Sequence, residues 1–337
     1  MERIPGLRDY VETPEYRRAL GLPPEMRETY RFLAQGEYNV NYAFTHPRTG
    51  QALVLRVNRG SQLHLRDQIG YEYRALRLLE PTGRTPRPLY ADGSKTRLPC
   101  GVLVMEYLPG RALDCRRELP LAADILADIH GASFSGADTA FLLSPERPLT
   151  AILNESRQMA DVYLSSPLAD SSVCRLLERM LTASRRLCET RDGPPPVRRC
   201  INTELNSTNF LISGPAGPNS LVDWEKPLLG DPAQDAAHFL APTTTFWKTD
   251  VLLTPDEEQV FFRRYLSAAG NRFDTAGLEE RTRAFLPVTC MRGAAWCAMA
   301  WVEYQRPGRP VRNESTARRL ERYLDPAFLE LLLRRWF

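Results

Sequence analysis

The chain has 337 residues, of which 43% are hydrophobic and 25% are charged, which is enough for one or two globular domains with sizeable cores. Its formal net charge is only +3, and its arginines are interleaved with acidic residues without any run of five like charges, which argues against nucleic acid as a partner. No stretch of about 18 uncharged apolar residues is present, and the first residues alternate in charge where a signal peptide would be apolar, so we expect a cytoplasmic protein with no membrane partner.

The first third of the chain predicts a small antiparallel sheet with one helix. Short β-like runs occupy residues 38–44, 52–58 and 101–107, and Pro and Gly in the turn at 46–50 reverse the chain between the first two. Between the second and third runs, residues 68–80 place apolar side chains at helical spacing with charges opposite them. We therefore expect a lobe over residues 1–107, with an N-terminal extension at 1–28.

The remainder of the chain, residues 108–337, is predicted to be mainly helical. Residues 173–188 carry apolar side chains at i, i+3, i+4, i+7 and i+8, and the prolines at 194–196 end that helix. Two short apolar runs at 209–212 and 221–224 flank a turn-rich segment, which indicates a β-hairpin set among helices. The seven cysteines are odd in number and scattered, without a Cys-x-x-Cys pair, so we expect reduced thiols in the core.

The segment NTELNSTNFLI, followed by LVDWE and then GDPAQD, resembles the catalytic core of the aminoglycoside phosphotransferase and choline kinase families. The resemblance extends from about Arg31 to the end of the chain. It implies an α+β, bilobal protein-kinase-like fold, with a small antiparallel-sheet N-lobe and a larger, mainly helical C-lobe. It also implies ATP and Mg²⁺ as cofactors.

Family resemblance assigns Asn209 and Asp223 to the magnesium ion, for which hard oxygen donors are suited. The residue five positions before Asn209 is the base in the family pattern, and here it is Glu204 in place of the usual Asp. Asn202 stands where the family has a His. Read without the family, the same segment would be a polar turn that leads into a core hairpin. We further expect Asp235 to brace this loop.

In residues 52–58, strand alternation points Val54 and Arg56 to one face, which would cover the nucleotide. Kinases place a lysine here, paired with a helix glutamate, and this chain offers Arg56 with Glu72. Arginine can hold phosphates as a permanent, bidentate cation. Alone, such an arginine would be read as a solvated strand residue.

The loop between residues 35 and 42 has a single glycine, Gly36, and so it is not a glycine-rich phosphate loop. By resemblance, polar residues such as Asn39 lie near the phosphates. Also by resemblance, the backbone of Glu106 and Leu108 would hydrogen-bond adenine, with Met105 behind it.

The sequence therefore predicts ATP-dependent phosphorylation of a small-molecule hydroxyl, with Glu204 as base. Aminoglycosides, amino alcohols, nucleosides and sugars all fit as the acceptor, and the sequence does not reveal the oligomeric state. Two alternatives remain: a non-catalytic nucleotide-binding or partner-binding pseudokinase, which the Glu204 and Asn202 departures would suit, and a nucleotidyl transferase.

Overall fold

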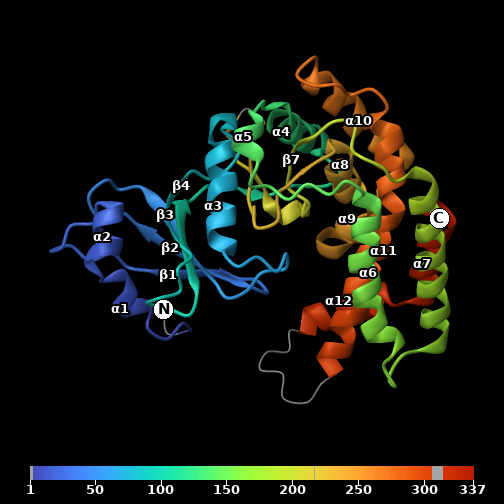
Figure 1. Ribbon diagram of the computed structural model, residues 1–337, viewed down its shortest axis with the longest axis horizontal. Helices are drawn as coiled ribbons and strands as arrows, with labels where there is room; N and C mark the ends of the chain where they lie inside the picture. Colours follow the sequence, from blue (N-terminus) through green and yellow to red (C-terminus); the bar gives the residue numbers. More distant parts are fainter. Residues whose placement is uncertain (1–2, 216, 306–313) are drawn as a thin grey trace. The chain divides into compact units, whose positions relative to one another are not determined.

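The computed structural model describes residues 3–215, 217–305 and 314–337, and the chain forms two compact units (Figure 1). The first unit contains Met1–Ala112, Ala132–Leu143 and Asn209–Pro227. The second contains Leu113–Gly131, Ser144–Thr208 and Leu228–Phe337. The first unit thus extends past the expected boundary at residue 107 and includes two segments from later in the chain.

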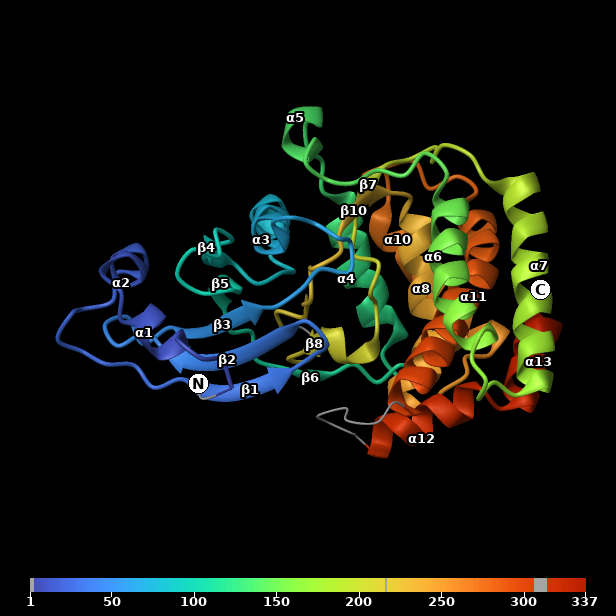
Figure 2. The ribbon, with the colours of Figure 1, turned by 60° about the horizontal axis from the view of Figure 1, so that its bottom comes forward.

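A five-stranded antiparallel sheet with strand order β1-β2-β3-β5-β4 forms the centre of the first unit (Figure 2). The three expected strands are confirmed as β2 (Asn39–Thr45), β3 (Ala52–Asn58) and β5 (Gly101–Glu106). The two edge strands, β1 (Arg31–Gln35) and β4 (Pro88–Asp92), were not expected. All five residues of β1 are exposed, so the strand lacks the alternation of buried and exposed residues that would have revealed it.

The N-terminal extension is part of the hydrophobic core of the first unit. Helices α1 (Leu7–Val11) and α2 (Pro14–Leu20) cover one face of the sheet, where Leu53, Leu55 and Val57 of β3 are fully buried. Thr13 caps α2 by accepting a hydrogen bond from the N–H of Tyr16. The expected alternation along β3 is confirmed, because Val54 and Arg56 lie outside this core cluster.

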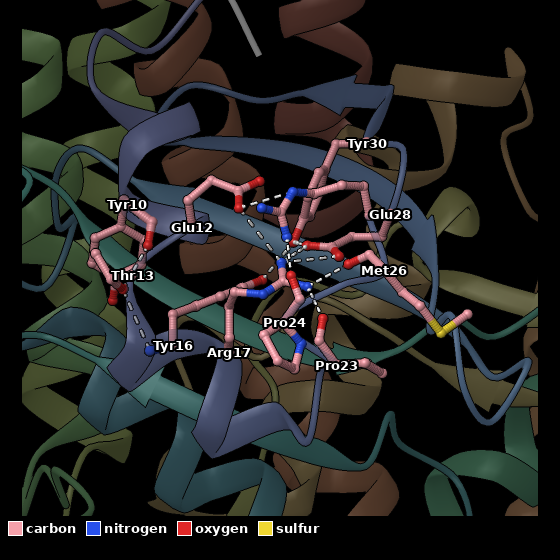
Figure 3. Close-up of polar contacts among 11 residues, drawn as sticks. Tyr10, Glu12, Thr13, Tyr16, Arg17, Pro23, Pro24, Met26, Glu28 and Tyr30 are labelled. Carbon is pink, nitrogen blue, oxygen red and sulfur yellow. Dashed lines mark hydrogen bonds and ion pairs between the residues drawn. The ribbon is translucent and has the colours of Figure 1, made fainter.

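Arg17 of α2 ties the segment after the helix to this core (Figure 3). Its guanidinium is almost completely buried and donates to the carbonyl oxygens of Pro23 and Met26, each at 2.6 Å. It also forms an ion pair at 3.2 Å with Glu28, whose side chain is 1% exposed. A buried charge of this kind is tolerated only when it is paired and hydrogen-bonded, as Arg17 is.

Helix α3 (Gln68–Leu79) is confirmed at the expected position and packs against β4 and β5 (Figure 1). Asp67 caps its start by accepting from the N–H of Gly70 at 2.8 Å. Ile69, Leu76 and Leu79 are buried as their spacing indicates. The neighbouring Tyr71 is also buried, and its hydroxyl donates to the carbonyl of Pro227 at 2.5 Å.

The segment Asn209–Pro227 contributes the expected hairpin to the first unit. Strand β8 (Phe210–Ile212) pairs antiparallel with β9 (Ser220–Leu221) and, on its other side, with β6 (Arg111–Ala112). Trp224, directly after the hairpin, is fully buried and donates its indole N–H to the carbonyl of Leu221. The metal-binding residues proposed from the sequence, Asn209 and Asp223, therefore lie at the same end of this hairpin.

The second unit is mainly helical, as expected. Its principal helices are α4 (Leu119–Gly131), α6 (Pro148–Leu164), α7 (Ser171–Arg191), α8 (Pro232–Leu240), α9 (Pro242–Thr249), α10 (Pro255–Ala269), α11 (Leu278–Gln305), α12 (Glu314–Tyr323) and α13 (Pro326–Trp336). A two-stranded pair, β7 (Arg199–Ile201) with β10 (Leu228–Gly230), lies among them.

Helix α11 is the central helix of this unit and contacts α6, α7 and α8 (Figure 2). Its length and a mean hydropathy of 1.2 over 18 residues would suffice to cross a membrane. However, 67% of that stretch is buried inside the protein. This burial is the pattern of a core helix, because a membrane span would present its apolar side chains to lipid.

Candidate active site

Arg56 is the centre of a buried ionic cluster in the first unit. Its Nη1 donates to Glu72 of α3 at 2.5 Å and to Asp223 at 3.2 Å. Its Nε donates to Asn41 of β2 at 3.1 Å. The pairing of Arg56 with Glu72 is confirmed, and the sequence did not reveal that Asp223 and Asn41 share the same guanidinium.

Burial sets the electrostatics of this cluster. The Glu72 side chain is 1% exposed, and one of its oxygens, Oε2, has no hydrogen-bond partner among the described residues. Burial raises the pKa of the Glu72 carboxyl, and the Arg56 guanidinium opposes that rise. Burial also disfavours the charged form of Arg56, but Glu72 and Asp223 reverse that effect, so the pKa of Arg56 is raised. Arg56 is therefore a permanent cation.

The hairpin β8–β9 brings Asn209 and Asp223 together. The N–H of Val222 donates to the carbonyl of Asn209 at 2.9 Å, and Phe210 pairs with Leu221. Asp223 follows at once in a left-handed backbone conformation, with φ +69°. Non-glycine residues adopt that conformation uncommonly, Asp and Asn more readily than most, and it often marks a functional turn.

The turn after Asp223 is held by side chains from the sheet and from α3. Asn39 Nδ2 donates to Glu225 Oε2 at 2.5 Å, and Gln68 Nε2 donates to the carbonyl of Glu225 at 2.6 Å. The sequence analysis did not predict Glu225 as a site residue. Its position two residues after Asp223 could have indicated it. The Asn39 side chain, expected near the phosphates, is thus already engaged with a carboxylate.

Cross-strand pairs show which residues share the sheet face of Arg56. Val54 lies opposite Met105 on β5, and Arg56 lies opposite Leu103. Residues directly opposite each other in adjacent strands project to the same face. Val54 and Met105 therefore lie on the face of Arg56, opposite the core face, as the alternation indicated.

The expected adenine-binding segment follows β5. The N–H of Glu106 donates to the carbonyl of Arg87 at 2.9 Å, and the N–H of Tyr107 donates to the carbonyl of Ala52 at 3.0 Å. These two amides are committed to the sheet. Hydrogen bonds to a nucleobase would have to come from the Glu106 carbonyl and the Leu108 amide.

Gly36 lies in the tight turn between β1 and β2, and its N–H donates to the carbonyl of Asn39 at 2.9 Å. A Cβ atom added to it would meet no atom within 4 Å. The space beside this glycine therefore remains open for a ligand to approach the backbone.

In the second unit, the loop that carries Glu204 is held by side-chain acceptors. Asp235 accepts from the N–H of Asn202 at 2.7 Å through Oδ2 and from the N–H of Thr203 at 2.8 Å through Oδ1. Asn202 Oδ1 accepts from the N–H of Glu204 at 3.0 Å, and His238 Nδ1 accepts from the N–H of Leu205 at 3.1 Å. Four consecutive amides are thus fixed, and the expected bracing role of Asp235 is confirmed.

These hydrogen bonds hold Thr203 in a strained backbone conformation. Thr203 has φ +69°, which is unusual for a β-branched side chain and persists only where the surroundings hold it. Asp235 is completely buried, and His130 contacts its Oδ2 at 3.1 Å while also contacting the Tyr265 hydroxyl. His130 is itself completely buried, and both of its ring nitrogens have a partner, so it is a core histidine.

Two helices supply a further charged pair in this unit. Arg292 of α11 binds Glu155 of α6 through Nε at 2.8 Å and Nη2 at 3.1 Å. Burial lowers the pKa of Arg292, but the carboxylates of Glu155 and, to a smaller extent, Glu204 raise it above its usual value. Arg292 and Glu204 therefore interact electrostatically. No sequence motif marks either helix residue, because the pair depends on how two helices pack.

Comparison with known proteins gives a family and a fold. The family model described as "Phosphotransferase enzyme family" matches residues 29–281. No curated protein sequence matches the chain significantly. The N-terminal helices α1 and α2 and the last helices lie outside the matched residues.

Solved structures resemble the chain along almost its whole length. A spectinomycin phosphotransferase, solved with ADP and spectinomycin, has a TM-score of 0.62 at 13% identity, over 90% of this chain and 92% of that one. An ethanolamine kinase from Plasmodium vivax has a TM-score of 0.62 at 14% identity, over 96% and 89%. A choline kinase from Cryptosporidium parvum has a TM-score of 0.62 at 12% identity, over 98% and 96%. At these identities the likeness establishes the protein-kinase-like fold.

Proposed function

Because this chain belongs to the phosphotransferase enzyme family, we propose that it transfers the γ-phosphoryl group of ATP to a hydroxyl of a small molecule. The observation that carries this proposal is Arg56, which is buried and bridges buried Glu72 and the partly exposed Asp223. Phosphoryl transfer requires a fixed cation beside the metal-binding carboxylate, because negative charge on the phosphates must be neutralised in the transition state. A structural ion pair would require only Arg56 and Glu72.

Magnesium fits the donors that the first unit offers. The Asn209 amide oxygen and the Asp223 carboxylate are hard oxygen ligands, which Mg²⁺ prefers, and the hairpin holds their backbones side by side. Asp223 already accepts a hydrogen bond from Arg56 through Oδ1, which restrains the orientation of its carboxylate. The ion would supply charge neutralisation on the phosphate oxygens.

The nucleotide would lie along the sheet face that carries Arg56. We assign the guanidinium to the α- and β-phosphates, the backbone of Gly36 to the phosphates, and Val54 and Met105 to packing on the base. The Glu106 carbonyl would accept from the adenine amino group, and the Leu108 amide would donate to the ring. The committed amides of Glu106 and Tyr107 support this choice of atoms.

Glu204 is assigned as the general base. The acceptor oxygen would form a bond to the γ-phosphorus while the bond to the β–γ bridging oxygen breaks, and the hydroxyl proton would pass to the Glu204 carboxylate as ADP leaves. Glu204 lies five residues before Asn209 in the chain, and its loop is held by Asp235 and His238. This bracing supports a carboxylate with a defined position in spite of its extra methylene.

The acceptor belongs to the class of small hydroxyl compounds, such as aminoglycosides, amino alcohols, nucleosides and sugars. We place the acceptor side in the second unit, near Arg292 and Glu155, because the negative charge of Glu204 raises the pKa of Arg292. A cytoplasmic location would supply ATP and keep the seven thiols reduced.

A non-catalytic nucleotide-binding protein is the second candidate, favoured by Glu204 and Asn202 in place of the family's Asp and His.

The decisive experiment follows the label from γ-labelled ATP across a panel of acceptors, with the parent chain and Asp223→Ala. We expect labelled acceptor and unlabelled ADP from the parent, loss of turnover in Asp223→Ala, and no turnover of either in excess EDTA. Exposed Asp274→Asn serves as a matched control and should retain parental activity. Circular dichroism confirms that the variants are folded.

Each rival has its own outcome in this experiment. Release of the label as pyrophosphate, with no labelled acceptor, would indicate a nucleotidyl transferase. Nucleotide binding without turnover of any acceptor would favour the non-catalytic protein. Equal activity in excess EDTA would exclude the assigned metal role of Asn209 and Asp223.

A further inference from the structure

Asn39 connects the loop between β1 and β2 to the turn that carries Asp223, and both lie in the first unit. It is the first residue of β2 and follows the loop directly. Its side chain is buried, and its Nδ2 donates to Glu225 Oε2 at 2.5 Å. The Asn39 amide therefore binds a protein carboxylate beside the turn that carries Asp223. This contact differs from the phosphate contact that the sequence predicted.

The orientation of this amide is determined by a second asparagine. Asn58, at the end of β3 and 1% exposed, donates from Nδ2 to Asn39 Oδ1 at 2.8 Å. Since the oxygen of Asn39 is occupied by that donor, its NH₂ group must face Glu225. The opposite amide orientation would place two donors together and an oxygen against the carboxylate, so it is disfavoured.

The remaining anchors of the turn come from α3 and β3. Gln68 Nε2 donates to the carbonyl of Glu225, and the Tyr71 hydroxyl donates to the carbonyl of Pro227, each on the backbone. Arg56 contacts the Asp223 side chain. Asn39 differs from these because it holds the side chain of Glu225 and directly follows the loop between β1 and β2.

We propose that Asn39 is a positioning residue that holds Glu225 and, through it, couples the loop after β1 to the metal-binding turn. The consequence is that magnesium-dependent nucleotide binding depends on Asn39, whereas binding of a nucleoside without phosphates does not. For its nucleotide readout this inference rests on the proposed function, and its structural readout does not require that function.

The test replaces one donor with an acceptor of the same shape. In Asn39→Asp, the new carboxylate can still accept from Asn58, but it places a like charge against Glu225 in a partly buried site. We expect the amides of residues 223–226 to exchange with deuterium about tenfold faster or more in the ligand-free chain, since a buried contact is lost. The exposed Asn271→Asp makes the same chemical change elsewhere and should exchange like the parent.

A swap of donor and acceptor identifies the contact. In Asn39→Asp combined with Glu225→Gln, the new glutamine can donate to the new aspartate, so exchange at residues 223–226 should slow again toward that of Glu225→Gln alone. An Asn39→Asp variant that exchanges like the parent, or a double variant that exchanges as fast as Asn39→Asp, would overturn the coupling.

The functional readout uses a fluorescent ADP analogue and adenosine. Asn39→Asp should raise the magnesium concentration for half-maximal binding of the analogue by about tenfold or more, while adenosine affinity changes by less than about twofold. An equal loss of adenosine affinity would indicate a general defect of the lobe and overturn the proposal. If the parent shows no magnesium-dependent binding, the proposed function fails, and the exchange experiment still decides whether Asn39 holds the turn.

Discussion

Arg56 shows how one side chain can serve three partners at once. Its guanidinium contacts Glu72, Asp223 and Asn41 from a position that is 6% exposed. Lysine, with its point charge on a flexible stem, could not match this planar set of donors. Removal of the cation would also leave Glu72 buried without a counter-charge, which is costly.

We therefore expect Arg56→Ala to weaken ATP binding more than Arg56→Lys does, while adenosine affinity changes little in either. The lysine variant keeps a positive charge near the phosphates but cannot reach all three partners. Calorimetric titration with ATP and with adenosine measures both effects, and Arg48→Ala in the exposed turn after β2 is the charge-matched control. Parental ATP affinity in both Arg56 variants would leave Arg56 a purely structural residue.

Glu204 depends on its loop, because the amides of residues 202–205 are fixed by Asn202, Asp235 and His238. We expect Glu204→Gln to lose ~10²- to 10⁴-fold in kcat, since an amide cannot accept the hydroxyl proton. Glu204→Asp should slow the reaction by roughly tenfold to a hundredfold, because the carboxylate retreats by about 1 Å. Nucleotide affinity should barely change in either.

The measurement is kcat for both variants and the parent with one identified acceptor. A Glu204→Gln variant as fast as the parent would exclude Glu204 as the base. A faster Glu204→Asp variant would mean that the loop is matched to the shorter side chain of the family.

Among the elements, α3 and the N-terminal helices act on the sheet in different ways. Helix α3 contributes Glu72 to the ionic cluster and two side chains to the turn after Asp223, so its position determines the geometry of this cluster and turn. Helices α1 and α2 bury the opposite sheet face. They lie outside the matched family region, yet they complete the core of the first unit.

The N-terminal helices should therefore be tested by stability. Arg17→Ala removes the partner of buried Glu28 and the donor to two carbonyl groups, so we expect a loss of ~3–5 kcal/mol in the free energy of unfolding. Urea unfolding measures the loss, and Arg18→Ala, exposed on the same helix, should change stability by less than about 0.5 kcal/mol. Equal stabilities for the two variants would contradict the structural role of Arg17.

At the scale of the whole molecule, the two compact units are interleaved along the chain. The first unit takes Ala132–Leu143 and Asn209–Pro227 from beyond its main segment. Strand β8 pairs with β6, and Glu225 and Pro227 receive hydrogen bonds from the sheet and from α3. The unit is therefore complete only when the later segments are present.

We expect a fragment of residues 1–112 not to fold cooperatively, because it lacks these segments and leaves Glu72 and Arg56 without the Asp223 turn. Circular dichroism melting and amide NMR dispersion of the fragment, compared with those of the full chain, measure this. A fragment with a sharp thermal transition and dispersed amides would show that residues 113–337 are dispensable for the first unit.

The sequence by itself determined the family, the fold class, the central strands and α3. Periodic apolar positions reveal elements that bury one face, as in α7, because that pattern follows directly from helix geometry. The order of Glu204, Asn209, Asp223 and Asp235 along the chain carried the resemblance to the family, since catalytic loops keep their spacing when the surrounding residues change.

Only the tertiary structure decided which partners these residues take. The Asn39 amide goes to Glu225, the Arg56 guanidinium to Asn41 and Asp223 as well as Glu72, and the Arg292 guanidinium to Glu155. The edge strand β1 and the role of α1 and α2 in the core were equally unreadable. Hydrogen bonds and ion pairs between distant segments depend on which atoms the packing brings within about 3 Å, and no local pattern in the sequence encodes that distance.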